Sequence, residues 1–106
     1  MNDMKWTESE KKLARRVFDA ALASELKEIM AEFKARAAAA ADPDDMWSIQ
    51  EYLFRKRREI EQKYDYRYSQ LPLVFGRLLR EGRIRQSQLD RLSEDKLSYI
   101  RRVATL

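Results

Sequence analysis

Cysteine and histidine are both absent from the 106-residue chain. Without cysteine, the chain can form neither disulfides nor thiolate metal sites. Histidine and cysteine also supply the commonest general bases, nucleophiles and transition-metal ligands, so the common catalytic arrangements are excluded. The remaining carboxylates, lysines, tyrosines and hydroxyls form no recognisable catalytic motif. We therefore expect a protein that is not an enzyme and has no metal site.

Glycine and proline are scarce, with two of each in the chain. Alanine, leucine, glutamate, lysine and arginine are abundant, and this composition favours helix nearly everywhere. No apolar run approaches the roughly 20 residues that a membrane span needs, and residues 1–5 lack the apolar stretch of a signal peptide. We expect no membrane insertion and a cytoplasmic location.

Positive charge is only slightly in excess, with a net charge of +4 although 38% of the residues are charged. Acids are mixed among the bases, whereas nucleic-acid binders usually segregate their positive charge. The basic run at 55–58 is interleaved with Glu51, Glu59 and Glu61, and four adjacent helical residues point in all directions. A charge network in solvent or between subunits is therefore favoured over a phosphate-binding face, and we expect no nucleic-acid partner.

Apolar periodicity predicts an all-α fold with two long helices in a single domain, residues 1–106. A capping box of Thr7 and Glu10 starts the first, about 7–41, whose apolar residues recur every three or four positions. Pro43 suits the first turn of the second, about 43–71, and Pro72 ends or kinks it.

A small helical head, about 72–106, follows. Gly82 suits the end of its first helix, and Ser93 suits the start of its last. The tyrosines at 64, 66 and 68 alternate as in a strand, but this alternation is too short to outweigh the surrounding helical pattern.

The two antiparallel long helices leave apolar residues without cover. A helix of about 30 residues spans about 45 Å, longer than a compact domain of this size. The helices bury one face against each other, so Trp47, Phe54 and Phe75 need further cover. A homodimer through the second helix supplies it. We expect its interface to contain Met46, Trp47, Leu53, Phe54, Arg57 and Ile60.

The second helix also carries charges at informative positions. Arg57 interrupts the apolar stripe, where a charge is costly unless Glu61 or an acid of a partner chain pairs with it. On a neighbouring face, Trp47, Glu51 and Arg58 place charges beside an aromatic anchor, a composition enriched at protein-binding surfaces. A core tryptophan and a solvated Glu51–Arg55 pair are the alternative interpretation.

Spaced motifs extend over most of the chain. They are an early tryptophan before the capping box, Asp44-Asp45-x-Trp47, Lys56-Arg57-x-Glu59-Ile60, Lys63-Tyr64-Asp65, Val74-Phe75, Glu81-Gly82, Leu92, Asp95-Lys96 and Leu106. Through these residues, without a gap, the sequence resembles the cyanobacterial fluorescence recovery protein family.

The resemblance implies an all-helical homodimer, without a cofactor, that binds the C-terminal domain of the orange carotenoid protein. Members of the family hasten the return of the red, photoactivated form to the orange form and help to detach it from the phycobilisome. The alternative is a dimeric adaptor for a different protein partner, in an organism without that photoreceptor.

The resemblance also implies which positions contact the partner. On the second helix these are Trp47, Arg57 and Glu51, where the family usually has aspartate, together with Gln50, which replaces a frequent histidine. In the head, a family aromatic contact falls on Leu73 and a family lysine falls on Tyr99. These departures affect the head more than the dimer helix.

Overall fold

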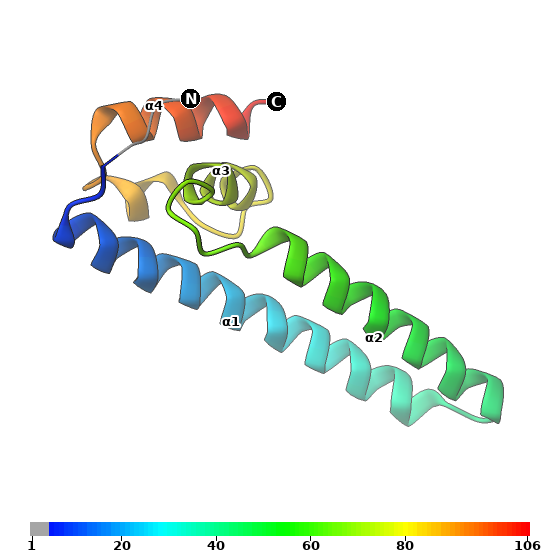
Figure 1. The fold of residues 1–106 in the computed structure, drawn as a ribbon. Helices are drawn as coiled ribbons and strands as arrows, with labels where there is room; N and C mark the ends of the chain where they lie inside the picture. The colour runs from blue at the N-terminus through cyan, green and yellow to red at the C-terminus, as the bar shows by residue number, and fades with distance from the viewer. Residues whose placement is uncertain (1–4) are drawn as a thin grey trace. The chain divides into compact units, whose positions relative to one another are not determined.

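The computed structural model describes residues 5–106, and every regular element among them is helical. In chain order the elements are α1 (Glu8–Ala39), α2 (Pro43–Lys63), α3 (Leu71–Arg80), the 3-10 helix η1 (Gln86–Leu89) and α4 (Glu94–Ala104) (Figure 1). The predicted all-α fold is confirmed.

The chain divides into two compact units. The head unit contains residues 5–21 and 64–106 of the described chain, and the hairpin unit contains residues 22–63. Helix α1 contributes to both units, since its N-terminal part belongs to the head unit and the remainder to the hairpin unit. The head therefore includes a segment that the sequence analysis had assigned only to a long helix.

The head unit has an apolar core of its own. Helix α3 buries side chains at spacings of three and four, as an amphipathic helix does. Three of them, Leu71, Phe75 and Leu78, have no exposed surface. The other buried apolar residues of the unit are Leu13, Ala14, Val17, Phe18, Ala21, Val74, Ile84, Leu89, Leu92 and Ile100. Phe75 was expected to need cover from a second chain, and this expectation is wrong because the head core already buries it.

Helices α3 and α4 of the head unit approach each other closely at Gly76. A Cβ atom at this position would lie 2.5 Å from the Cβ of Val103 and 3.1 Å from the carbonyl oxygen of Ile100. Any side chain at position 76 would therefore push the two helices apart.

A buried polar network holds the start of α1 inside the head unit. The predicted capping box is present, since the Thr7 N–H donates to Glu10 Oε1 (3.0 Å) and the Glu10 N–H donates to Thr7 Oγ1 (3.1 Å). The Glu10 carboxylate also accepts from the Ser93 N–H (2.8 Å) and from Lys96 Nζ (3.1 Å). Lys96 Nζ donates in addition to the Lys5 carbonyl (2.6 Å). These bonds join segments far apart in the sequence.

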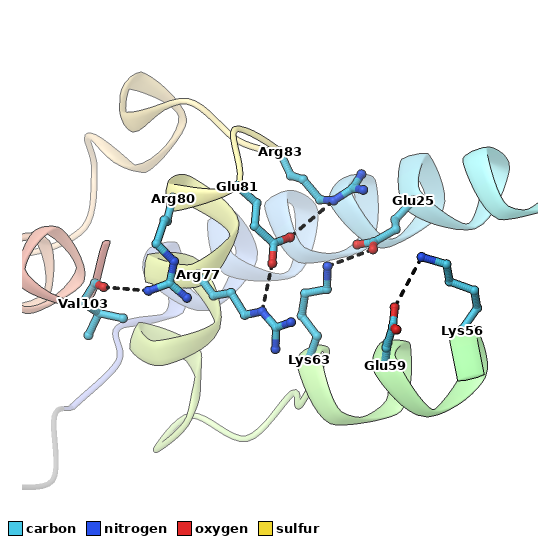
Figure 2. Close-up of polar contacts among 9 residues, drawn as sticks. All are labelled: Glu25, Lys56, Glu59, Lys63, Arg77, Arg80, Glu81, Arg83 and Val103. Atoms are coloured by element: carbon cyan, nitrogen blue, oxygen red, sulfur yellow. Dashed lines mark hydrogen bonds and ion pairs between the residues drawn. The ribbon is translucent and has the colours of Figure 1, made fainter. Parts of the chain in front are cut away.

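Gly82 was predicted to end a helix of the head and Ser93 to start one, and both do so. Gly82 adopts a φ of 74°, its N–H donates to the Leu79 carbonyl, and the Arg83 N–H donates to the Leu78 carbonyl. This hydrogen-bond pattern is a Schellman motif, which ends α3. The Glu81 side chain lies between Arg77 and Arg83 just before this turn (Figure 2). At the other signal, Ser93 caps α4 by accepting from the Lys96 N–H.

In the hairpin unit, α2 runs back antiparallel to the second part of α1 (Figure 1). The connection is short because local hydrogen bonds start α2 at once. The Ala41 and Asp42 N–H groups donate to Asp45 Oδ2, and the Asp45 N–H donates to Asp42 Oδ1. The two backbone hydrogen bonds lower the pKa of the Asp45 carboxyl. Pro43 occupies the first turn, as predicted.

Helix α2 ends at Lys63, well before the end predicted at Leu71. The tyrosine segment that follows is neither helix nor strand. Phe18 contacts the rings of Tyr64 and Tyr66 edge-on, at centroid distances of 5.4 and 4.8 Å. Aromatic contacts with the head core therefore replace the helical conformation that local propensity favours. Leu71 then begins α3, so Pro72 lies in a first turn and does not end a helix.

Candidate functional site

The two sides of α2 differ in their exposure within the hairpin unit. Tyr52 and Lys63 are buried and are separated by three helical turns, so they mark the side that faces α1. Lys63 Nζ lies 2.8 Å from Glu25 Oε2 of α1, with both side chains largely buried (Figure 2). The Arg36 guanidinium of α1 lies 4.1 Å from the centroid of the Tyr52 ring. Polar and cation–π contacts thus join the two helices.

The other side of α2 exposes three large apolar side chains. Met46, Trp47 and Phe54 are 55%, 59% and 64% exposed. Trp47 and Phe54 are two helical turns apart and lie on the same side. On α1, Leu26 and Met30 of the same unit are also exposed and one turn apart. We call these five residues the apolar surface of the hairpin unit.

Neither Leu26 nor Met30 was singled out from the sequence, in which the apolar residues of the first helix form one periodic stripe. The spacing of four between Leu26 and Met30 was the available signal. It could not identify an exposed surface, since the same spacing is typical of a buried helix face.

Charged side chains border the apolar surface on α2. Arg57 donates to Glu61 (3.2 Å), one of the two pairings that the sequence left open, and both side chains are exposed. The Arg58 guanidinium lies 5.9 Å from the centroid of Phe54. Gln50 and Glu51 are exposed on the same helix. The arrangement combines aromatic side chains with charges of both signs, which suits a protein-binding surface.

The remaining predicted dimer-interface residues, Leu53 and Ile60, are half-buried in the hairpin unit. They lie on the side of α2 between the one that faces α1 and the apolar surface. Each can therefore be covered further by another chain.

The basic run at 55–58 does not form one positive face. Lys56 bonds to Glu59 (3.4 Å, Figure 2) and Arg57 to Glu61, while Arg55 and Arg58 lie beside different aromatic rings. These four side chains are distributed around the helix, as expected for a network of local pairs. Residues 5–106 also contain no cluster of acidic side chains that could hold a metal ion.

The two predicted contact residues of the head lie on different helices of that unit. Leu73 of α3 is 41% exposed, although its neighbours Pro72 and Val74 are buried. Tyr99 of α4 is half-buried, with the Arg102 guanidinium 5.6 Å from its ring centroid. The predicted contact positions thus fall into two groups, four on the hairpin unit and two on the head unit.

Comparisons with known proteins agree over nearly the whole chain. The model of the family described as "Photoprotection regulator fluorescence recovery protein" matches residues 6–104. The fluorescence recovery protein of Synechocystis sp. is 37% identical over 101 residues, which cover 95% of this chain and 93% of that protein.

Solved structures give the same result. The fluorescence recovery protein of Fremyella diplosiphon matches with a TM-score of 0.90 and 30% identity, over 96% of this chain and 100% of that chain. The Synechocystis sp. structure matches with a TM-score of 0.91 and 36% identity, over the same shares of the two chains. No helix within residues 5–106 is long and apolar enough to cross a membrane.

Proposed function

Because the chain belongs to the fluorescence recovery protein family, we propose that it is a dimeric, non-enzymatic regulator of the orange carotenoid protein. It binds the C-terminal domain of the red, photoactivated form, accelerates the return to the orange form and promotes detachment from the phycobilisome. The carotenoid belongs to the partner, and this chain needs no cofactor.

The exposure of Trp47 is the observation that best supports this proposal. A tryptophan that is 59% exposed on a well-formed helix, beside the exposed Phe54, can serve as a binding anchor. Sequence reasoning left open a core position for Trp47, and its exposure in the hairpin unit favours binding. Glu51 and Arg57 on the same helix supply charges that can select a partner.

A second copy of the chain is the first partner that we propose for the apolar surface. Tyr52 is the one buried apolar side chain that residues 22–63 contain, and short helices with so little buried apolar surface are marginal in isolation. An isologous interface centred on Leu53, Arg57 and Ile60 would cover Met46 and Phe54. Sedimentation at micromolar concentration should give about twice the chain mass, and a monomer would contradict the dimer.

Acceleration of recovery requires unequal affinity for the states of the photoreceptor. A ligand shifts a conformational equilibrium only by its difference in binding free energy between the two states. The protein must therefore bind the red form, or the barrier between the forms, more tightly than it binds the orange form. Binding assays on the illuminated and the dark photoreceptor should show this difference directly.

The decisive test of the function is the rate of red-to-orange recovery in the dark. The parent protein, in excess, should accelerate recovery of at least one of several carotenoid photoreceptors. Trp47→Ala should then weaken binding roughly thirtyfold, since truncation of a central aromatic anchor costs about 2 kcal/mol. Ser48→Ala is the matched control, because Ser48 is an exposed neighbour on the same helix.

Two further measurements make the Trp47 result interpretable. Circular dichroism must show unchanged helicity, and sedimentation must show whether the variant still dimerises. A helical, dimeric Trp47→Ala protein that works like the parent would remove Trp47 from the partner surface. If the parent accelerates no photoreceptor, the function is that of a dimeric adaptor for another protein, an alternative that the departures at Gln50, Leu73 and Tyr99 leave open.

A further inference from the structure

A groove in the head unit lies between α1 and the segment around η1. It has a volume of about 460 Å³ and continues into a smaller hollow of about 180 Å³. Both hollows are lined by Leu13, Arg16 and Arg91. A volume of a few hundred cubic ångströms accommodates a few amino-acid side chains.

The groove combines an apolar floor with a basic rim. Leu13 and Val17 line it and are nearly fully buried, so their exposed atoms form the base. The exposed bases Lys12, Arg16 and Arg91 line the two hollows. This pattern follows from the helix repeat, since Lys12 and Arg16 are one turn apart, as are Leu13 and Val17.

The three basic side chains of the rim have no ion-pair partner among residues 5–106. Many other arginines do have one: Arg15 pairs with Asp19, Arg36 with Glu32, Arg77 with Glu81 and Arg101 with Glu94. The groove therefore gathers bases that the fold itself does not neutralise. A carboxylate of another molecule can pair with these basic side chains through charge-assisted hydrogen bonds.

We propose that this groove binds an acidic segment of a protein partner, with carboxylates on Arg16 and Arg91 and an apolar side chain on Leu13 and Val17. The polar side chains of Ser87 and Gln88 also line the groove and can bond to the peptide backbone. Asp90 lines it too and repels any anion near it, so the carboxylates of the segment would bind at the two guanidinium groups and not beside this side chain. The proposal rests on the function proposed above, because the partner is then the photoreceptor. The groove would be a contact region of the head unit in addition to Leu73 and Tyr99.

A peptide titration tests the groove independently of the photoreceptor. The probe is the labelled pentapeptide Gly-Glu-Leu-Glu-Gly, and the control peptide has glutamine in place of both glutamates. The full chain should bind the acidic peptide about tenfold more tightly, a difference of about 1.4 kcal/mol. Amide NMR signals of Leu13, Val17 and Gln88 should shift. Equal binding of both peptides, or shifts elsewhere in the chain, would overturn the proposal.

Substitutions of the rim arginines test whether they cause the preference for the acidic peptide. Arg16→Ala with Arg91→Ala should abolish the preference for the acidic peptide. Lys27→Ala with Lys34→Ala removes the same charge from exposed positions of α1 and should leave the preference intact. Loss of preference in both double variants would mean that net charge alone attracts the peptide. Inorganic phosphate that shifts the same signals more strongly than the acidic peptide would identify a free-anion site instead.

The recovery assay connects the groove to the proposed function. If the parent accelerates recovery, the Arg16 and Arg91 double variant should slow it relative to the Lys27 and Lys34 control, and an equal rate would exclude the groove from this interaction. If the parent accelerates nothing, the proposed function fails. The peptide titration still decides whether the groove binds acidic protein segments.

Discussion

The head unit and the hairpin unit are both helical but differ in the side chains that they bury. The head buries the complete side chains of Phe75, Leu78 and Ile100 and connects them through the polar network around Glu10. The hairpin leaves Trp47 and Phe54 exposed, and the contacts between its helices include the Lys63–Glu25 ion pair and the Arg36–Tyr52 cation–π contact. The head thus has a buried apolar core of its own, whereas the hairpin exposes apolar surface that the proposed dimer would cover.

A matched pair of phenylalanine truncations should separate the two units most strongly. Phe75→Ala removes a fully buried ring and should lower the stability of the head by about 3–5 kcal/mol. Phe54→Ala makes the same chemical change at an exposed position and should leave the head within about 0.5 kcal/mol of the parent. Hydrogen exchange of the Leu78 and Ile100 amides measures this local stability. Equal losses in both variants would refute the distinction.

Glu10→Gln should destabilise the head by about 2 kcal/mol at pH 7, because it removes the charge that neutralises the buried Lys96. Burial raises the pKa of the Glu10 carboxyl, but hydrogen bonds from Thr7, Ser93 and Lys96 outweigh this effect and lower the pKa overall.

The lowered pKa fixes the sign of the pH dependence. The contribution of Glu10 is complete above its unfolded pKa of about 4.5 and is lost as the pH falls through the lower, folded value. The difference between parent and Glu10→Gln should therefore be constant near neutral pH and shrink below about pH 4.5. Urea unfolding from pH 3 to pH 7 measures it. A difference that grows towards acid pH would contradict this assignment.

Gly76→Ala should destabilise the head by about 1–2 kcal/mol, because the added methyl group overlaps Val103. Val103→Ala in the same chain should recover part of the loss. Gly82→Ala provides the contrast, since space is open there and only the positive φ is unfavourable. Val103→Ala should not recover the stability lost in Gly82→Ala. A double-mutant cycle by thermal unfolding distinguishes packing from backbone strain.

The smallest effect on folding is expected at the edge of the apolar surface. Arg57→Leu changes helix propensity little and removes only an exposed pair with Glu61. Helicity should stay within error of the parent, while dimer affinity or partner recognition changes. Circular dichroism and sedimentation equilibrium measure the two quantities. A variant that dimerises and acts like the parent would make Arg57 an ordinary surface residue.

Helix starts and one helix end were predictable because their causes are local. Each signal acts within a few residues. Helices start at the Thr7–Glu10 capping box, at Pro43 and at Ser93, and a helix ends at Gly82. The early end of α2 at Lys63 was not predictable in this way. The residues that follow it, Tyr64 and Tyr66, contact Phe18, which lies far away in the sequence.

Burial was harder to predict than helix position. Phe75 and Trp47 both follow helical spacing, yet one is fully buried and the other is mostly exposed. Spacing identifies a common face, but it does not reveal whether the same chain covers that face. The contact roles of Gln50, Leu73 and Tyr99 came from the family resemblance alone and are proposals.

The chain has two tryptophans, and each unit contains one of them. Trp6 of the head is half-buried, 5.6 Å from the Tyr68 ring and 4.9 Å from Lys96 Nζ, whereas Trp47 of the hairpin faces solvent. Indole emission shifts to shorter wavelength when the ring leaves water. In a Trp6→Phe chain, the remaining emission therefore reports on Trp47 alone. The protein carries its own optical probe for any partner that covers the hairpin, and no dye has to be attached.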